Sequence, residues 1–134
     1  MARLEYAALY CGVNILILLV LAYLVVGLRR KHKIRLGDGG NERMIRAVRA
    51  HANAAEYIPA GMAGIILLAL MEPAAPAWLL HAAGIALTAG RIVHGVGLST
   101  GELNAGRVVG VALTWASYAI MGGGLIYAAV AQQL

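Results

Sequence analysis

The sequence contains few charged residues for its length. Aspartate, glutamate, lysine and arginine make up 13% of its 134 residues, whereas an ordinary soluble domain carries about 25%. A chain of this length forms one domain, and it is too short to hide a 61% hydrophobic composition behind a water-facing surface. The shortage of charge therefore excludes a soluble globule and indicates an integral membrane protein.

Cysteine is also nearly absent. Cys11 is the single cysteine, so no disulfide can form within the chain and a cysteine-rich metal site is excluded. We expect Cys11 to be a buried small hydrophobic residue rather than a reactive thiol. His51 and His94 stand among arginines, and no spacing of histidines and carboxylates resembles a ligand set. We therefore expect no metal site.

Positive charge is concentrated in one segment. Seven of the eleven lysines and arginines fall between Arg29 and Arg46, with long apolar stretches on either side. Most of the net charge of +5 therefore comes from one loop. Such a loop indicates membrane topology rather than a nucleic-acid-binding surface. We expect no nucleic-acid partner.

Four apolar stretches are long enough to cross a membrane, because about 20 helical residues span a hydrocarbon core of ~30 Å. We expect membrane spans at about 6–28, 49–71, 77–98 and 108–130. The first stretch is longer than the apolar part of a cleavable signal peptide, and a basic cluster follows it directly, so we expect a membrane span there. The predicted fold is an all-α membrane protein, a four-transmembrane-helix bundle.

The connections between the spans indicate the topology. A tight turn with positive φ angles is predicted at Gly37-Asp38-Gly39-Gly40-Asn41, and helix two should begin near Asn41 or Glu42. Prolines predict the next turn at Glu72-Pro73-Ala74-Ala75-Pro76. Lysine and arginine are frequent in the first loop, absent from the second and present around the third. The first and third loops are therefore expected in the cytoplasm and both termini on the opposite side, across the inner membrane if the source is bacterial.

Several ionisable residues stand within the predicted spans or at their edges. Such residues are costly in a membrane and usually have a partner or a task. At about 100° per residue, one arc of about 100° on helix two holds Arg46, Arg49, Asn53, Glu56 and Tyr57.

Helices three and four add further cations at the same depth. Arg91 and His94 are three residues apart and share one face of helix three, while Arg107 begins helix four from the same side. Four arginines near one carboxylate leave an excess of positive charge, which predicts a site for an anionic, water-soluble molecule. The alternative is that Glu56 pairs with one arginine as a tie between helices, and that the other arginines reach the lipid headgroups.

The segment from Arg46 to Pro59 resembles the signature of the MAPEG family, the membrane-associated proteins of eicosanoid and glutathione metabolism. Its pattern is an arginine, three residues, an asparagine, two residues, a glutamate, an aromatic residue and then a proline, here RAVRAHANAAEYIP. The resemblance covers the whole chain, including Arg91-Ile92-Val93-His94 and Arg107. It implies one four-helix domain over residues 1–134, assembled as a homotrimer, with glutathione held between neighbouring subunits near the cytoplasmic leaflet.

The resemblance also implies roles for individual residues. Arg49, Asn53 and Glu56 match positions that hold glutathione, with Glu56 as the partner of its amino group. Arg107 matches the arginine that stabilises the glutathione thiolate, and a fixed cation beside a thiol does favour its charged form. Weaker matches for glutathione binding are Arg46, His51, Tyr57, Arg91 and His94. The implied protein is a glutathione-dependent membrane transferase that conjugates or reduces lipophilic electrophiles, and peroxidase or isomerase chemistry could use the same thiolate.

The chain departs from the family pattern where relatives place tyrosines, late in helix three and early in helix four. Aliphatic residues stand there instead, at Ile92, Val96, Leu98 and Val111. The resemblance therefore does not extend to a step assisted by a hydroxyl group. This departure keeps open an alternative of another class, a non-catalytic membrane protein that binds an anionic metabolite or a lipid at the same basic site.

Overall fold

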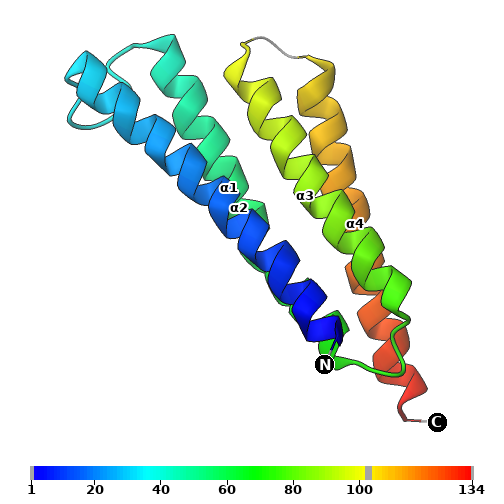
Figure 1. The fold of residues 1–134 in the computed structure, drawn as a ribbon. Coiled ribbons are helices and arrows are strands. Elements are labelled where there is room, and N and C mark those ends of the chain that lie inside the picture. The colour runs from blue at the N-terminus through cyan, green and yellow to red at the C-terminus, as the bar shows by residue number, and fades with distance from the viewer. Residues whose placement is uncertain (1, 102–103, 134) are drawn as a thin grey trace.

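The computed structural model describes residues 2–101 and 104–133, which form an antiparallel bundle of four helices (Figure 1). The bundle consists of α1 (Ala2–His32), α2 (Glu42–Leu70), α3 (Ala77–Ser99) and α4 (Ala105–Ala131). Each helix is long and apolar enough to cross a membrane. The predicted all-α bundle of four membrane spans is confirmed. Glu102 and Leu103, within the predicted third loop, lie outside the described residues.

The helices extend past the apolar stretches that predicted them. α1 continues through the basic residues to His32 because hydropathy marks only the apolar part of a helix. α2 begins at Glu42 as predicted, and the Asn41 side-chain oxygen caps it by accepting from the Met44 N–H at 3.1 Å. α4 begins at Ala105, three residues before the predicted 108, because Asn104 caps its first turn in the same way.

The two predicted turns have the expected positions. Gly37, Gly39 and Gly40 have φ angles of 67°, 61° and 69°, so the first loop turns through the left-handed region that glycine adopts without strain. The second loop occupies residues 71–76, between α2 and α3. It lies at the same end of the bundle as the chain termini (Figure 1).

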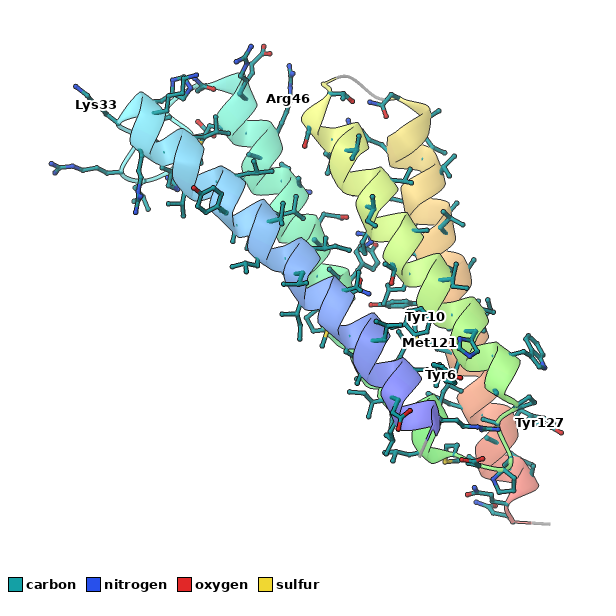
Figure 2. All side chains as sticks on the ribbon, viewed as in Figure 1. Tyr6, Tyr10, Lys33, Arg46, Met121 and Tyr127 are labelled. Carbon is teal, nitrogen blue, oxygen red and sulfur yellow. The ribbon has the colours of Figure 1, made fainter. Side chains whose placement is uncertain are left out.

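The helix pairs α1–α2 and α3–α4 form a V (Figure 1). They converge near the chain termini and diverge toward the end with the α1–α2 loop, which we call the basic end. Figure 2 shows Lys33 and Arg46 there, and Tyr127 near the opposite end. α2 packs against all three other helices, whereas the backbones of α1 and α4 do not approach each other closely in the described part of the chain. The larger apolar core includes Ile65, Leu80, Leu87 and Met121, and a smaller cluster is formed by Leu21, Ala50, Ala54, Ile58 and Leu98.

α3 and α4 approach each other closely through glycines. A Cβ atom at Gly110 would lie 2.6 Å from the His94 backbone nitrogen, and one at Gly97 would lie 2.7 Å from the Arg107 backbone nitrogen. Small residues allow such close packing between membrane helices. The contact fixes His94 of α3 against the first turns of α4, and it thereby positions the site described below.

Candidate functional site

Arg91 of α3 is the centre of a buried polar cluster. Its side chain is 2% exposed. The guanidinium donates through Nη1 to Asn53 Oδ1 at 2.8 Å, through Nε to Thr114 Oγ1 at 2.9 Å and through Nη2 to the Gly110 carbonyl at 3.4 Å. It also lies over the Tyr57 ring, with Cζ 5.1 Å from the ring centre. The cluster therefore joins α2, α3 and α4 within the bundle.

The acceptors around Arg91 are neutral. Within residues 2–101 and 104–133, no carboxylate forms an ion pair with this guanidinium. Hydrogen bonds satisfy its donors, but they leave its positive charge uncompensated. A buried cation of this kind adds a positive potential that favours anions nearby.

Two residues of α4 contact Tyr57. The Tyr118 hydroxyl donates to the Tyr57 carbonyl at 2.5 Å, and the Tyr57 and Tyr118 rings meet at 67° with centres 5.8 Å apart. Trp115 Nε1 donates to the Tyr57 hydroxyl at 3.3 Å. Sequence reasoning missed Thr114, Trp115 and Tyr118. The signal that could have found Thr114 and Tyr118 is their spacing with Ser117, three and four residues after Thr114, which places polar groups on one face of a membrane span.

A pocket of ≈ 360 Å³ contains Arg107 and His94. The remaining lining is mostly apolar and comes from α4, namely Val108, Val111, Ala112 and Trp115. The Arg107 guanidinium has no hydrogen bond or ion pair with any residue that the structure describes. The pocket thus combines an available cation with an apolar wall.

Arg49 and Glu56 lie on the surface of α2, exposed and seven residues apart. Neither side chain has a hydrogen bond or ion pair among the described residues, so the tie between Glu56 and an arginine is not formed within this chain. Two turns of helix separate them, about 10 Å along α2. They present a cation and an anion on one face of a membrane helix.

The other two predicted residues on α2 are less central. Arg46 forms an ion pair with Glu42 at 2.7 Å, and a Cβ atom at Gly101 would lie 3.1 Å from its Nη1. It therefore extends from α2 toward the end of α3, as Figure 2 shows. His51 is half-buried and has no hydrogen bond in the described part of the chain.

The structure thus brings Asn53, Tyr57 and Arg91 together, places His94 with Arg107, and leaves Arg46, Arg49, His51 and Glu56 outside both groups.

The fold and this site define a four-helix membrane protein with an excess of cations at the basic end. A model of the MAPEG family matches residues 7–127, and the chain belongs to that family. It is 37% identical over 116 residues to inner membrane protein YecN of Escherichia coli strain K12, a match that covers 86% of each chain. The YecN protein of Escherichia coli O6:H1 matches with the same identity and coverage. The resemblance of the Arg46–Pro59 segment is confirmed as family membership.

Proposed function

We propose that the protein is a glutathione-dependent membrane transferase that joins glutathione to lipophilic electrophiles. The observation that carries this proposal is the Arg107 pocket, where a guanidinium with no partner among the described residues lies beside Val108, Val111 and Trp115. The cation favours a thiolate over a thiol. The apolar wall suits an electrophile that arrives from the bilayer.

The available charges fit glutathione, which carries two carboxylates, one ammonium group and a thiol. Arg49 suits a carboxylate and Glu56 suits the ammonium group, because both side chains are exposed and have no partner in residues 2–101 and 104–133. Arg46 adds a cation that it shares with Glu42. In this proposal the buried Arg91 and the half-buried Asn53 and Tyr57 shape the floor of the site. His94 lines the pocket, and His51 lies beside the α2 residues.

A second copy of the chain would complete the site. Arg49 and Glu56 are exposed on a membrane helix, where contact with lipid is costly for an ionisable group. A neighbouring subunit over this face of α2 would remove both residues from lipid and enclose a polar ligand between the copies. We propose a homotrimer, and the number three comes from the family resemblance.

The reaction uses the thiol of the co-substrate as its nucleophile. The thiol proton passes to water, and Arg107 holds the charge on the sulfur. Arg107 cannot itself accept the proton, because a guanidinium is already protonated near neutral pH. The sulfur forms a bond to an electrophilic carbon, and the leaving group departs with the electron pair of the bond that breaks. Reduction or isomerisation of a lipophilic substrate would begin from the same thiolate.

The proposal also includes the orientation of the protein in the membrane. The basic end faces the cytoplasm and both termini face the other side, because lysine and arginine are retained in cytoplasmic loops. The site then opens toward cytoplasmic glutathione. The relative YecN is named an inner membrane protein, which supports an inner-membrane location for this chain.

The test is an Arg107→Ala variant assayed with glutathione and 1-chloro-2,4-dinitrobenzene, beside equilibrium binding of glutathione. We expect turnover to fall by about 10²–10³-fold, the loss typical when one group that stabilises developing charge is removed. Binding should persist, because Arg49 and Glu56 remain. The matched control is Arg43→Ala, which removes an exposed arginine of α2 that has no described partner. Its turnover should equal that of the wild type.

Two outcomes would contradict the transferase. Full turnover in Arg107→Ala would exclude this arginine as the group that stabilises the thiolate. Binding of glutathione or another anion without turnover in the wild type would favour the alternative, a non-catalytic protein that binds an anionic metabolite or lipid. The aliphatic residues at Ile92, Val96, Leu98 and Val111 are the feature that favours this alternative.

A further inference from the structure

A second groove lies between α1 and α3, apart from the Arg107 pocket. Its volume is ≈ 410 Å³, and its lining is almost wholly apolar. A stripe of apolar residues on α1, including Val13, Val20 and Leu24, forms one side of the groove. Ile92 and Val96 of α3 line the other side. Val20 and Val96 are 58% and 60% exposed, so the groove opens to the surroundings of the bundle. Arg91, Ser99 and Thr100 of α3 also line the groove, but their polar groups form hydrogen bonds within the bundle.

The groove has about the length of one leaflet of a bilayer. Val13 and Leu24 are separated by about 16 Å at ~1.5 Å per residue, roughly half of a ~30 Å hydrocarbon core. The stripe ends five residues before Arg29, where the basic cluster begins. The two helix pairs diverge toward this end (Figure 1). The groove therefore runs along the central part of the apolar stretch of α1 and extends toward the basic end.

Lys31 continues the groove stripe into the basic cluster. It follows Val13 by 18 residues, which is five full turns at about 100° per residue, so both residues point in the same direction from α1. Lys31 is exposed and has no hydrogen bond or ion pair among the described residues. The nearest acidic residues along the chain, Asp38 and Glu42, bond to Gly40 and Arg46. An available cation thus stands above an apolar groove.

We infer that this groove holds an acyl chain of an anionic phospholipid, with the lipid phosphate at Lys31. The apolar stripe matches the acyl chain of the lipid, and the cation next to it matches the phosphate. Basic residues beside membrane helices attract anionic headgroups. A second copy of the chain is the less suitable occupant. The exposed charges that need covering, Arg49 and Glu56, lie on α2, and α2 does not line the groove. The inference does not depend on the proposed transferase activity.

The test is native mass spectrometry of the full chain in detergent, with added phosphatidylglycerol or phosphatidylcholine. We expect preferential binding of phosphatidylglycerol. Lys31→Gln should weaken that binding about fivefold, the contribution of one lysine near a lipid surface. Arg30→Gln is the matched control, because it removes the same charge one residue away but about 100° around the helix. It should leave the binding unchanged.

A third variant, Val20→Trp, fills the groove from a position that is already 58% exposed. It should lose bound phosphatidylglycerol while keeping the elution profile and thermal unfolding of the wild type. Equal binding of the two lipids, equal losses in Lys31→Gln and Arg30→Gln, or retained binding in Val20→Trp would each overturn the inference. Crosslinking between copies through a Val96→Cys variant, above the background from Cys11, would show that a second copy occupies the groove and would also overturn it.

Discussion

At the scale of single residues, the buried guanidinium of Arg91 depends on a threonine. Thr114 Oγ1 accepts from both Nε and Nη2 of Arg91, and the threonine hydroxyl donates in turn to the Gly110 carbonyl. Thr114 is itself fully buried, so water cannot replace its oxygen. A buried charged donor without an acceptor costs more than a neutral one, because it loses a stronger interaction with water.

Thr114→Val keeps the shape of the side chain and removes the hydroxyl group. We expect this variant to lose about 1–3 kcal/mol of stability, because it leaves buried donors of Arg91 unpaired. Thr114→Ser keeps the oxygen and should retain most of the stability. Thermal unfolding in detergent measures both variants. Equal melting temperatures for Thr114→Val and the wild type would show that Arg91 does not rely on this oxygen.

The sequence predicted which residues share one side of α2. It did not predict which of them face the other helices and which are exposed. Asn53 and Tyr57 lie on the edge that faces the bundle, where Arg91 contacts both of them. Arg49 and Glu56 lie on the other edge and are exposed. Helical periodicity gives the relative directions of side chains, while the rotation of the helix against its neighbours decides which edge is buried. That rotation depends on contacts between helices, such as those of Tyr57 with Tyr118 and of Asn53 with Arg91.

At the scale of helices, hydropathy predicted the spans well and their ends less well. The first predicted span ended at 28, yet α1 continues to His32, because lysine and arginine are good helix formers that hydropathy does not count. Asn41 was recognisable as a helix start from the turn before it. Asn104 also caps a helix, but it was missed because the predicted span was started at the first apolar residues of α4.

The close packing of α3 and α4 predicts a large difference between two glycine substitutions. A Cβ atom in Gly110→Ala would lie 2.6 Å from the His94 backbone nitrogen, so the helices would have to separate. We expect a loss of about 1–3 kcal/mol, as for other overpacked interiors. Gly123→Ala is the control, because a Cβ atom there meets no atom within 4 Å. Denaturant unfolding in detergent compares them, and equal stabilities would contradict the close contact.

At the scale of the whole molecule, the V arrangement separates two environments around α3. Arg107 and His94 line a pocket with α4, whereas Ile92 and Val96 line the apolar groove with α1. Arg91 borders the groove as well, and its guanidinium bonds to Asn53 of α2 and Thr114 of α4. A polar co-substrate and a lipid would therefore occupy different sides of α3.

The central claim is that Arg107 stabilises a glutathione thiolate, and ultraviolet difference absorbance tests it most directly. Purified wild-type protein with glutathione should show thiolate absorbance well below the pH at which free glutathione ionises, because the guanidinium favours the charged sulfur. Arg107→Ala should shift the absorbance back toward the pH of free glutathione. Absence of thiolate absorbance in the wild type, or the same pH dependence in both proteins, would contradict the claim.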